Sequence, residues 1–196
     1  MKFYEISGQS CTGKTSFIRD HLKSDKNYIL YERNTVNLFS DFISGLKYLG
    51  IKRIKRVFLW SLKENAPLLF RLNIFRNSVT KFGIFLKLTN NNKSRKRTYL
   101  VDEGVSHLPF IFLNTSTNEV INFIAFELSS LNVKFLTCDQ RNDIESRLSK
   151  RGHKRLMFLD KTDFVNRNFS IQSILIEIYP GLCKSFVKLE NVRNTE

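Results

Sequence analysis

The 196-residue sequence predicts an α/β protein in which a parallel sheet carries helices on both of its faces. Short apolar runs typical of strands alternate along the chain with longer segments whose apolar residues recur at helical spacing. This alternation favours a parallel sheet, because parallel neighbours must be joined by a crossover connection that is usually a helix. No repeat or long linker divides the sequence, so residues 1–196 are expected to form a single domain.

The expected strands are short and rich in β-branched and aromatic residues. They cover residues 2–7, 28–31, 98–101, 133–137 and 185–189. The expected helices cover residues 14–23, 38–46, 51–62, 67–79, 116–128, 139–155 and 160–178. Two local signals mark helix ends: Ser116 and Glu119 have the spacing of a capping box, and Pro180 with Gly181 is expected to stop the last helix.

The chain is strongly basic, with 32 Lys and Arg against 18 Asp and Glu and a net charge of +14. Most of this charge lies in a helical insert of about residues 35–97, between the second and third strands. Four of its cations interleave with apolar residues: Lys52, Arg53, Lys55 and Arg56. Such a helix lies on an anionic surface, binds an anionic substrate or exposes a solvated basic face, and the sequence leaves these alternatives open.

Three observations bear on cellular location. The cysteines Cys11, Cys138 and Cys183 are odd in number and widely spaced, which disfavours a disulfide scaffold or zinc site and favours a reducing compartment. Glu5 interrupts any signal-peptide core, and no apolar run is long enough to span a bilayer. We therefore expect a cytoplasmic protein, with peripheral contact at the inner face of a membrane as a compatible alternative.

The most specific motif runs from Gly8 to Thr15 and matches G-x-x-x-x-G-K-[ST] between an expected strand and an expected helix. In this arrangement backbone N–H groups surround phosphate oxygens, and the helix adds the positive end of its dipole. Lys14 is expected to reach the β- and γ-phosphates, and Thr15 to offer its hydroxyl to Mg²⁺. The predicted nucleotide-binding residues are Gly8, Gln9, Ser10, Cys11, Thr12, Gly13, Lys14, Thr15 and Ser16.

Two further patterns suit phosphate chemistry. Asp102 ends an apolar strand, the usual place of a Walker B metal ligand, although a turn or helix-capping aspartate is the alternative. Arg147 and Arg151 are four residues apart, so a helix places both on one face, where guanidinium groups can hold phosphate oxygens. Gly152 beside them indicates the hinge of a lid over about residues 139–155, with a solvated basic face as the alternative.

The order of these features resembles the thymidylate kinase group of P-loop kinases, which includes the deoxynucleoside kinases. The resemblance implies a three-layer P-loop NTPase fold whose five-stranded parallel sheet has the order 2-3-1-4-5, together with the use of ATP and Mg²⁺. It also implies that Arg147 and Arg151 are lid arginines with a catalytic role beside Lys14. Glu32 and Arg33 lie where the family places acceptor-binding residues, at the end of the second strand.

One departure from the family concerns the acceptor. The family commonly has Asp-Arg after the third strand, whereas Asp102 is here followed by Glu103, which argues against thymidine monophosphate. A carboxylate suits a hydroxyl acceptor, whose proton must be removed, so Glu103 and Glu32 favour a hydroxyl over a phosphate. Activation of water by Glu103, or a structural ion pair of either glutamate with a nearby arginine, remain alternatives.

Together these patterns predict an ATP-dependent phosphotransferase that acts on a hydroxyl or phosphate of an anionic acceptor, such as a nucleoside, a nucleotide or a sugar of an acidic glycan. A GTPase is suggested by Asp160-Lys161-Thr162-Asp163, which lacks the Asn of N-K-x-D. A nucleic-acid-stimulated ATPase is not favoured, because the 18 phenylalanines mostly follow apolar stripes. A membrane-associated nucleotide-binding module and a homodimer are compatible with the sequence.

Overall fold

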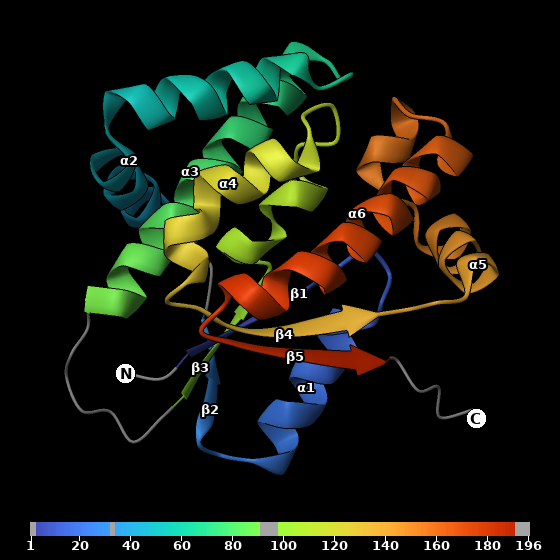
Figure 1. Ribbon diagram of the computed structural model, residues 1–196, viewed down its shortest axis with the longest axis horizontal. Helices are drawn as coiled ribbons and strands as arrows, with labels where there is room; N and C mark the ends of the chain where they lie inside the picture. The colour runs from blue at the N-terminus through green and yellow to red at the C-terminus, as the bar shows by residue number, and fades with distance from the viewer. Residues whose placement is uncertain (1–2, 32–33, 91–97, 191–196) are drawn as a thin grey trace.

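The structure is a computed structural model that describes residues 3–31, 34–90 and 98–190, apart from the side chain of Arg151. Its centre is an all-parallel sheet of five strands in the order β2-β3-β1-β4-β5, which confirms the expected fold (Figure 1). The strands are β1 (Phe3–Gly8), β2 (Tyr28–Leu30), β3 (Thr98–Asp102), β4 (Asn132–Thr137) and β5 (Ser185–Glu190). Because β1 lies in the middle, the loop that follows it opens at the centre of the sheet's carboxyl edge.

Helices cover both faces of this sheet. They are α1 (Lys14–Ser24), α2 (Thr35–Lys63), α3 (Leu68–Asn90), α4 (Thr117–Leu128), α5 (Arg141–Arg151) and α6 (Lys161–Leu182), with two short 3₁₀ helices, η1 (Val105–Phe110) and η2 (Lys154–Met157). α1 lies on one face, and η1, α4 and α6 lie on the other (Figure 1). None of the helices in the described ranges has both the length and the apolar character needed to cross a membrane.

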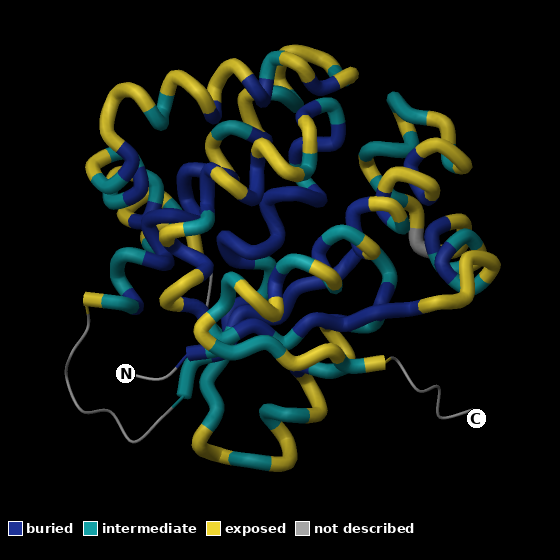
Figure 2. The backbone as a smooth tube through the Cα atoms, in the orientation of Figure 1, coloured by how far each residue is buried: buried dark blue, intermediate teal, exposed yellow. Residues whose placement is uncertain are grey.

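Successive side chains along each strand point to opposite faces of the sheet. Leu100 and Leu136 pack with Ile18 of α1, whereas Val101 and Phe135 belong to the larger core on the opposite side. Burial of each such side chain stabilises the fold by about 1.5–3 kcal/mol. Figure 2 shows the resulting buried band, in dark blue, between the sheet and the helices above it.

The insert consists of α2 and α3, which pack along one another. Gly50 (φ 64°, ψ 169°) breaks α2 into two arms, which correspond to the two helices expected over this segment. The fully buried carboxylate of Glu127 in α4 accepts hydrogen bonds from Tyr48 (2.8 Å) and Arg53 (2.8 and 3.1 Å). Arg53 therefore differs from the other three cations of this segment, because its guanidinium supplies the charge that a buried carboxylate needs.

Of the two expected helix-end signals, Ser116 is confirmed as the N-cap residue of α4, whereas the expected stop at Pro180 is wrong. Ser116 makes no side-chain cap, and Glu119 instead accepts a hydrogen bond from Nε1 of Trp60 (3.1 Å), so a tertiary contact replaces the capping box. Pro180 lies inside α6, which continues beyond it. A proline close to a helix end removes one backbone hydrogen bond, and the last turn persists where the preceding Tyr179 is fully buried.

Candidate active site

The loop between β1 and α1 has the backbone of a phosphate-binding loop. Gly8 (φ 136°), Cys11 (φ 63°) and Gly13 (φ 90°) all have positive φ, and a side chain at Gly8 would overlap the carbonyl oxygen of Leu136. Glycine suits that position because it lacks a Cβ atom. Gly13 is the N-cap residue of α1 and has no side chain that competes for the first N–H groups of the helix, which suits an anion there.

Lys14 connects this loop to the end of β3. Its Nζ donates to the carbonyl oxygens of Gly8 (3.0 Å) and Gln9 (2.8 Å) and lies 3.2 Å from Oε1 of Glu103. The lysine is 7% exposed, so its position is fixed by packing as well as by these contacts. Phosphate oxygens bound in the loop would compete with these acceptors for the ammonium group.

Asp102 and Thr15 both line the cleft in front of the P-loop. Asp102 ends β3 beside the central strand, where it is in register with Ile6. A carboxylate and a hydroxyl fit Mg²⁺, which is usually held by one or two carboxylates together with phosphate oxygens and water. Within the described ranges no cluster of three or more His, Cys, Asp or Glu side chains is placed to hold a metal.

Glu103 adopts a φ of +55°, a left-handed conformation that is uncommon for a residue other than glycine. Its N–H donates to Ile6 (3.0 Å), and its carbonyl oxygen accepts from Nζ of Lys81, so β1 and α3 hold this conformation. The carboxylate is 36% exposed and lies beside both Lys14 and His107, whose Nε2 is 3.6 Å away. The backbone thus places this carboxylate at the cleft, next to the P-loop lysine.

The pKa values of Glu103 and His107 are shifted by opposed effects. Burial raises the pKa of the Glu103 carboxyl, but His107, Lys14 and Lys81 outweigh burial and hold this pKa well below its usual range. Burial lowers the pKa of His107 well below 6.5, and the opposing effect of Glu103 does not overcome it. At neutral pH Glu103 is therefore ionised and His107 is uncharged, so the charges of Lys14 and Lys81 favour the carboxylate there, and His107 adds to them only when it is protonated.

A buried carboxylate from β1 shapes the turn that follows Glu103. Glu5 accepts hydrogen bonds from the backbone N–H groups of Val105 (3.0 Å) and Ser106 (2.8 Å), at the start of η1. Burial raises the pKa of Glu5, although these hydrogen bonds oppose the shift. Gly104 passes so close to this carboxylate that a Cβ atom would overlap it. Glu5 and Gly104 therefore fix the path of the chain on which Glu103 lies.

Arg147 of α5 contacts the P-loop directly. Its Nη1 donates to the carbonyl oxygen of Cys11 (3.0 Å), which brings a guanidinium group to the rim of the phosphate-binding loop. Arg141, at the start of the same helix, instead pairs with Glu145 on the surface (2.9 Å). Of these two arginines, Arg147 alone contacts the P-loop.

The single helix expected over residues 139–155 of the lid is not found. α5 ends at Arg151, its C-cap residue Gly152 has a φ of 67° outside the helical range, and η2 begins at Lys154. Arg151, the second predicted lid arginine, is the last residue of α5, and its side chain falls outside the described part of the chain. The role of Arg151 stays a prediction.

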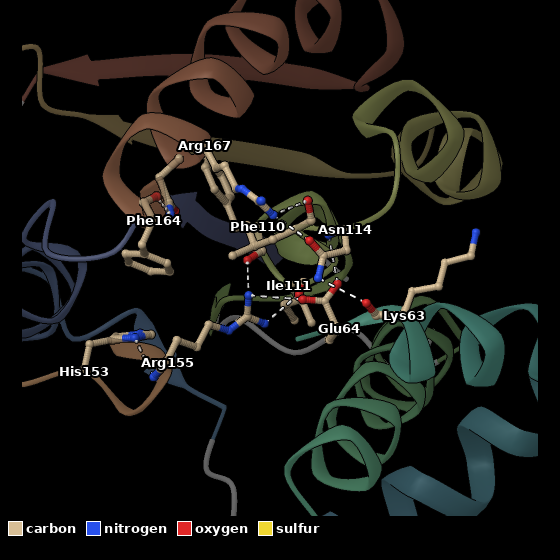
Figure 3. A network of polar contacts seen from close by, with 11 residues as sticks. Lys63, Glu64, Phe110, Ile111, Asn114, His153, Arg155, Phe164 and Arg167 are labelled. Carbon is tan, nitrogen blue, oxygen red and sulfur yellow. Dashed lines mark hydrogen bonds and ion pairs between the residues drawn. The ribbon is translucent and has the colours of Figure 1, made fainter. Parts of the chain in front are cut away.

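Arg155, in η2, ties the lid segment to the rest of the site (Figure 3). It donates to the carbonyl oxygen of Ile111 (2.5 Å) and lies 4.0 Å from the buried carboxylate of Glu64. Glu64 also accepts from the backbone N–H of Asn114 (3.1 Å), whose side chain accepts from Arg167 of α6 (2.5 Å). This network joins the lid, the insert and the segment after β3, and no sequence pattern indicated it.

The P-loop, α3, η1 and the lid segment surround a cleft of about 740 Å³, a volume typical of small-molecule sites. Asn73, Asn77 and Lys81 line it from α3 at intervals of four residues, which places them on one helix face. Sequence reasoning missed these residues and His107. The sequence did show that Asn73, Asn77 and Lys81 share one face of an otherwise apolar helix. Only the tertiary structure shows that this face points toward the P-loop.

The predicted acceptor residues Glu32 and Arg33 lie outside the described residues. Tyr31, directly before them, donates to both carboxylate oxygens of the buried Asp41 (2.9 and 3.0 Å) in α2. The chain is therefore anchored where it leaves β2, and the acceptor role of Glu32 and Arg33 stays a prediction.

Comparison with solved structures finds the same fold in deoxyadenosine kinase from M. mycoides. The structure of that enzyme with bound dATP covers 96% of this chain and 91% of its own, with 12% identity and a TM-score of 0.53. A second structure of it, with the products dCMP and a flexible dCDP bound, covers 96% and 90%, with 14% identity and a TM-score of 0.50. No family model and no curated protein matches the sequence. The expected fold, with its strand order 2-3-1-4-5, is confirmed, and its layout resembles that of this deoxynucleoside kinase.

Proposed function

We propose that this protein is an ATP-dependent phosphotransferase that moves the γ-phosphate of ATP to an acceptor bound in the cleft. The observation that carries the proposal is the ion pair of 3.2 Å between Lys14 and Glu103, which brings a P-loop lysine and a carboxylate together at one end of the cleft. Phosphoryl transfer uses a cation to bind the phosphates, and transfer to a hydroxyl also uses a base that takes up the hydroxyl proton. The shared fold with deoxyadenosine kinase supports the same class of reaction.

The triphosphate of ATP would occupy the loop formed by residues 8–16. Lys14 would exchange the carbonyl oxygens of Gly8 and Gln9 for phosphate oxygens, as the loop backbone supplies further N–H donors. Thr15 and Asp102 would hold Mg²⁺, which when bound neutralises phosphate charge. Arg147, already in contact with the loop, would add positive charge close to the transferred group.

Glu103 is the proposed base for a hydroxyl acceptor. As the acceptor oxygen bonds to the γ-phosphorus and the bond to the leaving ADP oxygen breaks, the hydroxyl proton passes to this carboxylate. The ion pair with Lys14 helps to lower the pKa of Glu103 and so weakens it as a base. Phosphate oxygens that engage Lys14 would reduce this effect, so nucleotide binding would strengthen the base.

The polar groups on α3 and in the lid segment define the proposed acceptor class. Asn73 and Asn77 offer amides that suit the hydrogen-bonding groups of a base or a sugar, and Lys81 and Arg155 add positive charge to the cleft. These groups fit a nucleoside, a nucleotide or a sugar of an acidic glycan. Because the kinase that shares this fold binds dATP and dCMP, nucleosides and their monophosphates are the first acceptors to test.

The test is release of ADP from ATP across a panel of nucleosides, nucleoside monophosphates and acidic sugars. We expect acceptor-dependent release, reduced on the order of 100-fold in Lys14→Ala because the main cation on the phosphates is lost. The matched control is Lys23→Ala, which changes an exposed lysine near the end of the same helix and should leave the rate unchanged. Wild-type turnover in Lys14→Ala would overturn the site.

Hydrolysis of ATP is the competing outcome, because Glu103 follows Asp102 at a position where a carboxylate can activate water. A single-turnover reaction with ATP labelled in its γ-phosphate separates the two. Label on the acceptor supports phosphotransfer, whereas label in inorganic phosphate at the same rate with and without acceptor supports an NTPase. Tight ATP binding without either product would identify a nucleotide-binding module and contradict the proposal.

A further inference from the structure

The second arm of α2, residues 51–63, exposes cations on one side. Counted from the first of its outward cations, the others follow after three, four and eleven residues, and these helical spacings place all of them on one side of the helix. This basic ridge consists of Lys52, Lys55, Arg56 and Lys63. Two large apolar side chains accompany it, Ile51 (87% exposed) and Leu59 (47% exposed).

The basic ridge borders an open hollow of about 540 Å³ between α2 and α4. All four ridge cations line this hollow, together with Leu59, Leu62 and Trp60. Glu119 is the only acidic side chain that lines it from the described residues, and its carboxylate is engaged by Nε1 of Trp60 (3.1 Å). The hollow is therefore positively charged, with an apolar floor.

No exposed carboxylate balances this charge on the insert. Residues 34–90 contain two acidic residues, Asp41 and Glu64, and both are buried. Asp41 is paired with Lys87 (2.5 Å), and Glu64 accepts from the backbone of Asn114. The outer surface of the described insert thus presents positive charge without negative charge.

The basic ridge lies apart from the proposed active site. Figure 1 shows the second arm of α2, in teal, along the rim of the molecule farthest from the sheet, and Figure 2 shows exposed residues along its outer side. No ridge residue lines the cleft in front of the P-loop. A large partner can therefore occupy the ridge while the cleft remains open.

We propose that the second arm of α2 docks the protein on an anionic lipid bilayer. The ridge cations would lie among phosphate headgroups, and Ile51 and Leu59 would enter the boundary between headgroups and acyl chains. Charge alone would suit any polyanion, but two exposed aliphatic side chains beside the cations favour a surface that also accepts apolar groups. The proposal is independent of whether the cleft transfers phosphate.

The test is sedimentation of the full chain with vesicles of phosphatidylcholine, with and without about 30 mol % phosphatidylglycerol. We expect binding to the anionic vesicles alone, weakened by added salt because screening shortens the reach of the charges. The triple variant K52E/K55E/R56E should lose affinity on the order of 100-fold, since each basic residue near a membrane surface contributes about fivefold. The matched control K23E/K26E/K184E makes the same change in net charge on exposed lysines elsewhere and should bind nearly as wild type.

A second pair of variants tests whether the exposed apolar side chains of the second arm of α2 contribute to vesicle binding. I51S/L59S should weaken vesicle binding, whereas F126S/V187S, at exposed sites outside the insert, should not. Thermal unfolding and ADP release of each variant show that it remains folded. Three results would overturn the proposal: absence of wild-type binding to anionic vesicles, equal loss in the ridge and control variants, or use of the ridge for nucleic acid or self-association instead of lipid.

Discussion

Nζ of Lys14 and Oε1 of Glu103 lie 3.2 Å apart, so the P-loop and the segment after β3 meet in one ion pair. The two side chains differ in solvent exposure and in their other contacts. Lys14 is 7% exposed and is also held by two backbone carbonyl groups, whereas Glu103 is 36% exposed and faces the cleft. If the proposed function holds, a change at Glu103 is expected to reduce phosphate transfer without weakening nucleotide binding.

We expect Glu103→Gln to reduce transfer to a hydroxyl acceptor by about 10²–10⁴-fold, the usual contribution of a general base. The affinity for ATP should stay the same or rise, because the amide no longer competes with phosphate for Lys14. Calorimetric titration with ATP and single-turnover transfer measure the two effects. Glu177→Gln, on the exposed side of α6, is the control, and an equal loss of affinity and transfer in Glu103→Gln would remove the proposed base.

Arg147→Ala should lower phosphate transfer on the order of 10²-fold, because it removes a charged donor that already reaches the carbonyl oxygen of Cys11 (3.0 Å). Arg147→Lys should restore part of the rate, since the charge returns without the planar guanidinium group. Arg141→Ala is the matched control, because Arg141 pairs with Glu145 on the surface of the same helix. The kinetics contradict the lid role if Arg141→Ala and Arg147→Ala behave alike.

Gly104→Ala should destabilise the protein by about 1–3 kcal/mol, the usual cost of forcing extra atoms into a packed site. The new Cβ would overlap the carboxylate of Glu5, which holds the start of η1. Gly181→Ala has open space around the added atom and should be neutral or stabilising by up to about 1 kcal/mol. Urea unfolding of both variants measures the difference, and equal stabilities would show that the contact between Gly104 and Glu5 is not tight.

His107 should make stability depend on pH below about 6.5. Because burial lowers the pKa of His107, the unfolded chain takes up a proton that the folded chain does not, and stability falls as the pH decreases from 7.5 to 5.5. His107 lowers the free energy of unfolding by at most ~1.4 kcal/mol for each pH unit. His107→Gln should remove this pH dependence, whereas His21→Gln should retain it. The lowered pKa of Glu103 affects stability only below about pH 4.5, and the raised pKa of Glu5 affects wild type and both variants alike.

Urea unfolding at the two pH values provides the measurement for this prediction. The difference in unfolding free energy between pH 7.5 and 5.5 is compared among wild type, His107→Gln and His21→Gln. An unchanged difference in His107→Gln would mean that the imidazole is not buried in its neutral form.

The sequence alone determined the features that depend on local spacing. The P-loop from Gly8 to Thr15 was predicted from a motif whose glycines and lysine have fixed positions. The position of Asp102 at the end of a strand was predicted from the apolar run that precedes it. The alternation of strands and helices predicted the parallel sheet, and the resemblance carried by the motifs gave its strand order. Local signals were less reliable at helix ends, where the contact between Glu119 and Trp60 replaced a capping box.

The tertiary structure decided which side chains meet. Lys81 and His107 belong to a helix and a turn far apart in the chain, yet both flank Glu103. Arg53 turns inward to Glu127 while its neighbour Lys52 lies on the surface, although the two are equivalent in sequence pattern. Periodicity defines the faces of a helix, but the partner of each face depends on packing between distant segments, and this packing is what builds the cleft and its charges.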